Sequence, residues 1–356
     1  MTPTAGTPSS PADVVTPVAS ISPASSGKLA NAISVKEVRS TTVTYGDFDA
    51  TSLPTLPFGL YYQPTEDGLT ERLRDYTLVE NLDTGAYNGL VSRMQEKQKL
   101  SLERIVTIAS NFLAKAVTHF GKYPIADIAK KMGITPATLI ERMYREDVVT
   151  LIFACRLKVV GSSCAFQDDI KPEQQPRTPF DYAIDTECGC EEAKRIKYDP
   201  RSTEEYSLRQ MEMKLYETDS IAKPVFEIQL PRGFSDGSST ITKFYVEPLK
   251  WFQMGRVASK EQEASDDFKV MHEMIVAIPE SEIYGQSKNP RPFGKELYYA
   301  MSNTDIKALR SAITALDFGP NTARQIFCYH CQKNVQYQIP WPAIAQFIYS
   351  SDELAG

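Results

Sequence analysis

Apolar residues recur at helical spacing over residues 98–119, which predicts a long amphipathic helix. Ser101 stands just before the first apolar position, where its hydroxyl can accept a hydrogen bond from a free backbone N–H and cap the helix. The apolar residues of this face are Leu102, Ile105, Val106, Ile108, Ala109, Phe112, Leu113 and Ala116. A helix with one such face is expected to pack against the rest of the fold.

Two further segments have helical patterns. Residues 145–160 are charged at their start and then strongly apolar as far as Gly161, which predicts a buried helix that could run into a strand. Thr77 can cap a short helix over residues 78–82.

Strand-like patterns dominate after residue 180. Runs rich in β-branched and aromatic residues predict strands at 180–185, 195–198, 224–230 and 238–251. We expect residues 255–316 to be mostly helical and residues 323–350 to form a hairpin and a short terminal segment. The chain is therefore predicted to have an α+β fold.

These patterns divide the chain into four regions. Residues 1–34 are rich in Pro, Ser and Thr and too poor in apolar surface to offset their ordering entropy, which predicts a flexible arm. That arm either stays solvated or becomes ordered on a neighbouring subunit. Residues 35–97 are expected to form strands and turns, residues 98–160 a helical region, and residues 161–356 a β-rich and helical region with cysteine turns.

Charge and hydropathy exclude some classes of protein. The 356 residues include 39 Lys and Arg against 45 Asp and Glu, a net charge of −6, which argues against nucleic-acid binding over the whole surface. No run of 18 apolar residues is present, so we expect no membrane-spanning helix. The first residues lack the basic start and apolar stretch of a secretory signal, so we expect synthesis in a reducing cytoplasm.

Four cysteines form the main candidate site. Cys328 and Cys331 form a C-x2-C turn between strand-like runs, and Cys188 and Cys190 form a C-x-C turn in a similar setting. If the two turns meet, their thiolates would hold one structural Zn²⁺ that staples the fold. Reduced cysteines in turns, or a disulfide formed later, are the alternatives, and His330 could replace one thiolate. Cys155 and Cys164 lie near an apolar run and are expected in the core.

Residues 125–140 have the pattern of a helix-turn-helix. Gly133 allows the turn, Thr135 can cap the second helix, and Pro136 suits its first position. The fold class is therefore a helical block with this unit, plus a β-rich part closed by a split zinc-ribbon-like pair of cysteine turns. This unit either packs against other helices of the fold or provides the recognition helix of a DNA-binding regulator that has a structural zinc ribbon.

The would-be recognition helix has mixed charge. It offers Arg142 and Arg145, but Glu141, Glu146 and Asp147 lie beside them. Base reading needs a basic surface around such a helix, so the mixture argues against DNA binding. The chain also lacks a Gly-rich phosphate loop, an HExxH motif and a G-x-S-x-G motif, and we expect no catalysis.

Three segments in order along residues 50–350 resemble the T4-like phage baseplate hub proteins. The first is LPTLPFGLYY at 53–62, followed by Gly68 and LTERLRDYTLVENL. The second is Asp147 with VVTLIFACRLKVVG. The third is the pair of cysteine turns, the later one within FCYHCQKNVQYQIPWPAIAQFIY.

The resemblance implies a structural or assembly component of a contractile phage tail baseplate. Such a protein works through interfaces with other baseplate or tail proteins, without catalysis, and passes from the host cytoplasm into the virion tail. Tyr and Trp are enriched at interface hot spots, so Tyr61, Tyr62 and Trp341 are our candidate interface residues, although each could equally belong to the core.

Overall fold

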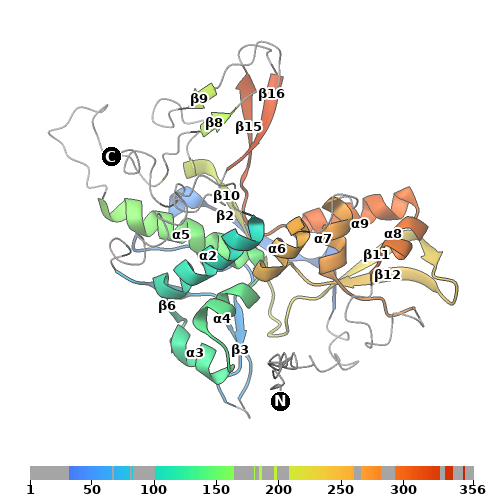
Figure 1. Cartoon of the computed structure of the whole chain (residues 1–356), viewed down its shortest axis with the longest axis horizontal. Coiled ribbons are helices and arrows are strands. Elements are labelled where there is room, and N and C mark those ends of the chain that lie inside the picture. The colour runs from blue at the N-terminus through green and yellow to red at the C-terminus, as the bar shows by residue number, and fades with distance from the viewer. Residues whose placement is uncertain are drawn as a thin grey trace, which may run out of the picture.

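The structure is a computed structural model of the whole chain (Figure 1). It describes residues 32–65, 68–80, 82, 101–163, 180, 184–186, 196–198, 208–259, 266–281, 293–328, 333–339 and 348. Helices and mostly antiparallel sheets together form the molecule, which confirms the predicted α+β class.

The helices of the described residues lie in two groups. The first group, in the helical block, is α2 (Leu102–Ala116), α3 (Ile125–Lys131), α4 (Pro136–Arg142), α5 (Arg145–Ser163) and α6 (Trp251–Ser259). The second group, beside the largest sheet in Figure 1, is α7 (Asp266–Met274), α8 (Lys295–Ala300) and α9 (Asn303–Ala315). Short 3-10 turns are η2 (Val35–Glu37), η3 (Tyr45–Asp47) and η6 (Leu208–Gln210).

The described strands form three sheets of three or more strands. One has the order β1-β11-β12-β13, made of β1 (Ile33–Ser34), β11 (Phe226–Ser235), β12 (Thr240–Val246) and β13 (Ile275–Ala277). A second has the order β14-β10-β2, made of β14 (Gly319–Pro320), β10 (Glu212–Glu217) and β2 (Arg39–Thr44). A third has the order β5-β6-β7, made of β5 (Tyr76–Leu78), β6 (Val117–Phe120) and β7 (Tyr123–Pro124). Only the β1–β11 pair among the described strands is parallel.

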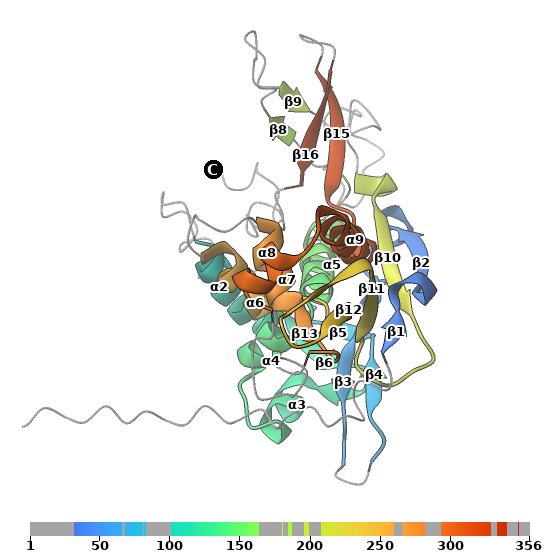
Figure 2. The same cartoon turned by 90° about the vertical axis from the view of Figure 1, so that its right-hand side faces the viewer.

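The remaining described strands form three two-stranded hairpins, which extend from the body. They are β3 (Leu60–Tyr62) with β4 (Glu71–Leu73), β8 (Ile184–Thr186) with β9 (Ile196–Tyr198), and β15 (Ala323–Cys328) with β16 (Lys333–Gln338). Figures 1 and 2 both place β8–β9 and β15–β16 at one end of the molecule and β3–β4 at the opposite end. The predicted hairpin near the C-terminus is thereby confirmed.

The first hydrophobic core surrounds α5. Every residue from Val148 to Leu157 is buried, Thr150 and Arg156 included, so this stretch of the helix is covered on all sides. Helix α2 packs on it with the predicted face, in which Val106, Phe112 and Leu113 are buried. The Ser101 side chain accepts from Arg104 N, which confirms the predicted N-cap.

A second core lies between the β11–β12 hairpin and helices α7, α8 and α9. It contains Phe226, Phe244, Phe293 and Leu309, all of them fully buried. Helix α6 lies between the two groups of helices and contacts both α2 and α7. At the first residue of α6 the fully buried Trp251 donates Nε1–H to the carbonyl of Val106, 3.2 Å away, so α6 is fastened to α2 within the first core.

Three local predictions differ from the structure. Thr77 does not begin a helix, because residues 76–78 form strand β5 and Leu78 pairs with Val117 of β6. Helix α5 does not change into a strand near Gly161 but continues to Ser163. The last two residues of the predicted arm, 33–34, form β1 beside β11.

Candidate functional site

Side chains from other parts of the fold form hydrogen bonds with both the backbone amides and the backbone carbonyls of a buried turn at residues 56–59. Asp147, in the first turn of α5, accepts hydrogen bonds at Oδ1 from Phe58 N at 2.8 Å and Gly59 N at 3.2 Å. Its side chain is 1% exposed. We call this cluster, which is made of residues 56–59, Asp147, Arg72 and Arg74, the Asp147 junction.

Two arginines hold the carbonyls of the same turn. Arg72 Nε donates to Phe58 O at 2.6 Å, and Arg72 Nη2 donates to Pro57 O and to Tyr216 O, each at 3.0 Å. Arg74 Nε donates to Leu56 O at 3.0 Å. The Arg72 guanidinium also lies 5.2 Å from the centre of the Tyr216 ring. A fixed planar donor array suits two carbonyls at once, so the turn is held rigidly.

Burial shapes the electrostatics of the junction. It raises the pKa of Asp147 to about 7, and this effect outweighs the two amide bonds and the nearby Arg72, which lower the pKa. Burial also raises the pKa of Tyr61, whose hydroxyl lies in the same region. A carboxyl with this pKa could exchange a proton near neutral pH, but both amide bonds fall on its Oδ1, which points to fastening the turn as its role.

The junction unites two segments that carry the resemblance. Residues 56–59 and Arg74 belong to the first segment, and Asp147 opens the second one. Sequence reasoning named Asp147 but missed Arg72 and Arg74 as a pair. Their spacing of two residues is a signal that could have found them, since alternate residues of a strand share a face.

The helix-turn-helix prediction is confirmed as a structure. Gly133 adopts φ +66° between α3 and α4, and the Thr135 side chain accepts from Thr138 N at the start of α4. Leu139 and Ile140 are buried, and α4 packs against α2 and α6. The unit is therefore packed into the helical block.

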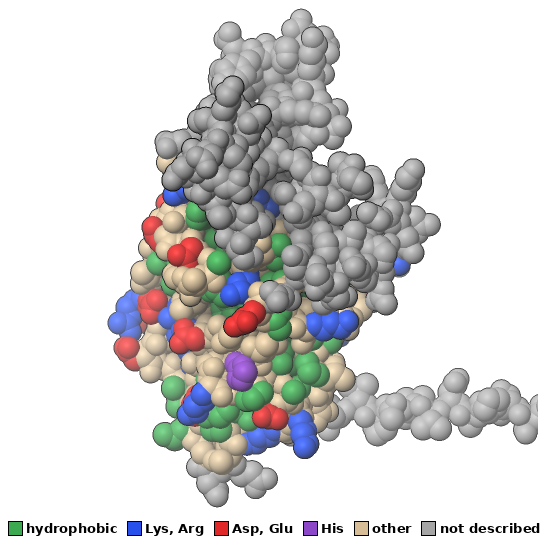
Figure 3. All heavy atoms as spheres, turned by 90° about the vertical axis from the view of Figure 1, so that its left-hand side faces the viewer, with side chains coloured by type: hydrophobic (Ala, Val, Ile, Leu, Met, Phe, Trp, Pro, Cys, Tyr) green, Lys and Arg blue, Asp and Glu red, His purple; other side chains and the backbone are tan. Residues whose placement is uncertain are grey.

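The basic residues proposed for DNA reading have different surroundings. Arg142 is exposed, whereas Arg145 Nη2 lies 2.8 Å from Glu146 Oε1 and 2.6 Å from Asp317 Oδ1. On the face shown in Figure 3, basic and acidic side chains are interspersed over the part drawn in colour. Mixed charge of this kind does not form the basic surface that a DNA backbone requires.

The predicted zinc ligands lie mostly outside the described residues. Cys188, Cys190 and Cys331 are not described, and Cys328 is described only as the last residue of β15, opposite Lys333. The hairpins that flank the two cysteine turns lie at the same end of the molecule in Figures 1 and 2. The part of the chain that the structure describes contains no group of three or more His, Cys, Asp or Glu residues placed to hold a metal, so the four-cysteine site stays a prediction.

The predicted interface residues and the predicted core cysteine differ in how far they are buried. Tyr62 is 7% exposed, and its ring packs edge-on against Tyr123. Tyr61 is half-buried, and Trp341 lies outside the described residues. Cys155 is a free, buried thiol, as expected of a core residue.

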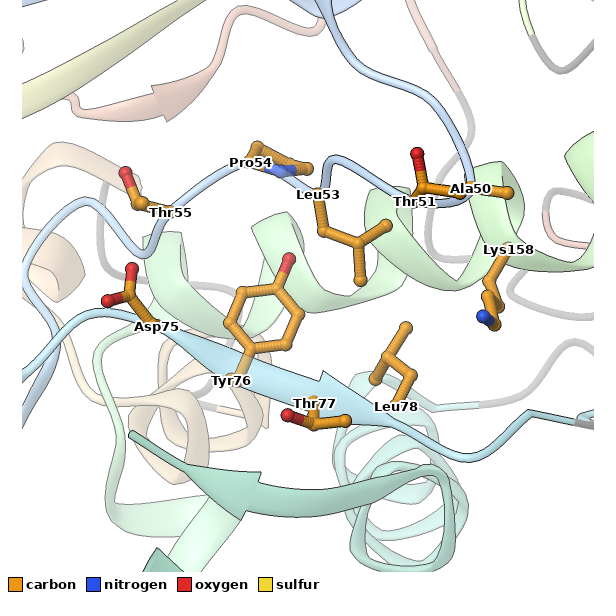
Figure 4. Close-up of a pocket in the computed structure, with 10 residues that line it drawn as sticks. All are labelled: Ala50, Thr51, Leu53, Pro54, Thr55, Asp75, Tyr76, Thr77, Leu78 and Lys158. Carbon is orange, nitrogen blue, oxygen red and sulfur yellow. The ribbon is translucent and has the colours of Figure 1, made fainter. Parts of the chain in front are cut away.

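A cavity of about 290 Å³ lies beside β5 (Figure 4). Its walls come from the loop at residues 50–55, from β5 and from Lys158 of α5. Sequence analysis gave no sign of it, because residues far apart in the chain form its walls.

Comparisons of the chain with protein-family models, curated proteins and solved structures find no match. Among the described helices, none combines the length and hydropathy that crossing a bilayer requires.

Proposed function

We propose that this chain is a structural or assembly component of a contractile phage tail baseplate that acts through protein–protein interfaces and without catalysis. The observation that carries the proposal is the Asp147 junction. Segments that resemble the baseplate hub proteins at separate places in the sequence interlock there through buried hydrogen bonds.

The junction supports a scaffolding role because its polar groups bind backbone. Asp147 binds two amides, and Arg72 and Arg74 bind carbonyls, so these side chains fix the position of a turn relative to α5 and β10. Each of these bonds pairs a backbone group of the buried turn and so restrains the turn. A rigid frame suits a protein that must hold other subunits in fixed positions.

The hairpins at the two ends supply a second argument. The β15–β16 and β3–β4 hairpins extend from opposite ends of the body, where neighbouring subunits could contact them (Figure 2). Structural Zn²⁺ bound by Cys188, Cys190, Cys328 and Cys331 would fix the β8–β9 and β15–β16 hairpins relative to each other. Only residues of this chain would serve as its ligands.

Co-purification tests the proposal directly. The chain, tagged at its C-terminus and expressed in cells infected by the phage that encodes it, should be recovered with baseplate subunits, and antibodies against it should label either tail particles or baseplate assembly intermediates. A tagged cytoplasmic protein of similar size and charge serves as the control. A chain that stays monomeric and retains no tail subunit contradicts the proposal.

The DNA-binding alternative has its own readout. We expect no electrophoretic shift of duplex DNA by the purified chain, even at low salt, because Arg145 is held by two carboxylates. A salt-dependent shift that Arg142→Ala weakens, with Arg39→Ala as a control at a distant exposed site, would favour the regulator instead.

A further inference from the structure

Strand β2 leaves one edge of its sheet open to solvent. It is an outer strand of the order β14-β10-β2, and Figure 2 shows it outside β10, away from the α-helices. Four consecutive residues of the strand, 39–42, are exposed. Because neighbouring residues of a strand point to opposite faces, both faces are accessible along this stretch. A further strand can therefore reach the edge of β2.

The outward backbone groups of β2 follow from its pairing with β10. Tyr45 N, just after the strand, donates to Met211 O at 2.8 Å in the same register. Inward and outward residues alternate in an antiparallel pair. The N–H and C=O groups of Ser40, Thr42 and Thr44 therefore point away from β10, into the open edge.

The free part of this edge ends at Thr44. Asp47 Oδ2 accepts from Thr44 N at 3.1 Å, so that amide already has a partner. No residue within the described ranges forms a hydrogen bond with the outward N–H or C=O of Ser40 or Thr42. These two residues thus offer a donor and an acceptor each to an incoming strand.

Strand β2 lacks the features that usually protect an open edge. Native proteins keep such edges from pairing with other chains by means of Pro, bulges or charged side chains. The six pairs of β2 with β10 run without a bulge, and the strand contains no Pro. Its charged residue is Arg39 at the first position, and Ser, Thr and Val fill the rest. The edge is therefore suited to pairing.

Charge at the two ends of β2 indicates what pairs with it. The N-terminal end carries the exposed Lys36 and Arg39 against the exposed Glu37, whereas the C-terminal end carries the exposed Asp47 and Asp49. A second copy that runs antiparallel to the first places the acidic end of each strand beside the more basic end of the other. The edge is therefore complementary to itself in charge.

We propose that two copies of this chain associate through their β2 edges, antiparallel and with the two-fold axis at Thr41. Ser40 of each copy then exchanges both of its outward hydrogen bonds with Thr42 of the other, so every free group of the two edges has a partner. An axis at Thr42 is less favourable, because it places the Ser40 carbonyl opposite Thr44 N–H, which Asp47 already holds. An interface of this kind uses the same surface on both subunits.

The inference goes beyond the baseplate proposal and does not depend on it, since a chain that pairs with itself needs no tail subunit. A monomeric chain that still co-purifies with tail subunits would overturn this inference alone.

A disulfide cross-link tests the register on the full chain. The two copies of Thr41 face each other as a non-hydrogen-bonded pair, with Cα atoms about 4.5 Å apart, which a disulfide can span. We expect Thr41→Cys to form an intermolecular disulfide on mild oxidation, identified by mass spectrometry of the linked peptides.

The matched control for the cross-link is Thr42→Cys, at the neighbouring exposed threonine. The two copies of this position are diagonal neighbours at about 7–8 Å, too far apart for a disulfide. We expect little cross-linking there. Equal cross-linking of the two variants at the introduced thiols, or none in either, would overturn the proposal.

Analytical ultracentrifugation under reducing conditions tests the association itself. We expect a reversible dimer whose population rises with concentration, measured up to millimolar chain because small interfaces bind weakly. Thr41→Lys should raise its dissociation constant by about tenfold, since like charges then lie directly opposite each other. Thr107→Lys, at an exposed threonine of α2, should leave it unchanged. A chain that stays monomeric, or a dimer that Thr41→Lys does not weaken, would overturn the proposal.

Discussion

The Asp147 carboxyl accepts two hydrogen bonds, yet burial disfavours its charged form. Its two amide partners favour the carboxylate, but burial favours the neutral acid more strongly and raises the pKa to about 7. A carboxyl whose pKa is higher in the folded than in the unfolded state binds more protons when folded. It therefore stabilises the fold fully below about pH 4, and this contribution is lost as the pH rises through about 7.

The first prediction concerns Asp147→Asn, which keeps an oxygen acceptor but cannot titrate. Between about pH 5 and pH 8 the free energy of unfolding of the unmodified chain should fall by about 2–3 kcal/mol relative to that of the variant. Urea unfolding followed by tryptophan fluorescence at several pH values measures the difference. Glu146, whose pKa burial also raises, is present in both proteins, and its charge is one of the causes that raise the pKa of Asp147, so the comparison reports Asp147 together with this neighbour. Parallel pH profiles would contradict the assigned pKa.

The second prediction concerns the turn that Asp147 binds. Gly59 has φ +79°, and a Cβ there would lie 2.8 Å from Leu73 O. We expect Gly59→Ala to lower the free energy of unfolding by about 2–4 kcal/mol, because the left-handed conformation and a clash with rigid backbone both penalise the new methyl group.

The matched control for that change is Gly237→Ala. Gly237 also has a positive φ, +92°, but nothing lies within 4 Å of the added Cβ. We expect Gly237→Ala to lower the free energy of unfolding by about 1–2 kcal/mol, because only the left-handed backbone conformation penalises the new methyl group. Equal losses in the two variants would show that the close approach to Leu73 is unimportant.

Elements are joined in this fold by side chains that bind backbone across an interface. Asp305, near the start of α9, is fully buried and accepts at Oδ1 from Arg232 N at 2.8 Å and from Gly233 N at 3.4 Å on β11. Its other oxygen accepts from Ser302, the N-cap of the same helix. One carboxylate thus fixes both the start of α9 and its position on the sheet.

The third prediction follows from this contact. Asp305→Ala should lower the free energy of unfolding by about 2–4 kcal/mol, because it removes the acceptor of two partly buried amides and of the Ser302 hydroxyl. Asp219→Ala is the control, since that carboxylate is 94% exposed and its ion-pair partner among the described residues is the exposed Arg39. We expect no measurable change there, because exposed ion pairs contribute little. Similar urea midpoints for the two variants would argue against the role assigned to Asp305.

At the scale of the whole molecule, the β8–β9 and β15–β16 hairpins lie at the same end. In the sequence, each pair of predicted zinc ligands falls at or between the two strands of one of these hairpins. The fourth prediction is that the chain, purified without a His-tag, contains one zinc per molecule and that Cys328→Ser loses it, because a four-ligand site needs all its thiolates. Cys155→Ala, at a buried core thiol, should keep the metal and serves as the control. Elemental analysis and the thermal midpoint of unfolding measure both effects, and an unmodified chain without zinc would remove the site.

The sequence determined those features that depend on neighbours within a few residues. The buried face of α2, the Ser101 cap, the turn at Gly133 and the hairpin near the C-terminus were all predicted, because helical periodicity, capping and turn chemistry act locally. The α+β class follows from the same local patterns.

Where distant segments meet depends on contacts between residues far apart in the chain. Thr77 lies in a strand because β6, about forty residues later, pairs with it and overrides its capping preference. Asp147 reaches amides that lie 88 and 89 positions earlier in the chain, and the cavity beside β5 combines residues of the loop at 50–55 with Lys158 of α5. Such contacts depend on long-range burial and pairing, which no local pattern specifies, and for that reason the sequence predicted the elements but not the junction or the cavity.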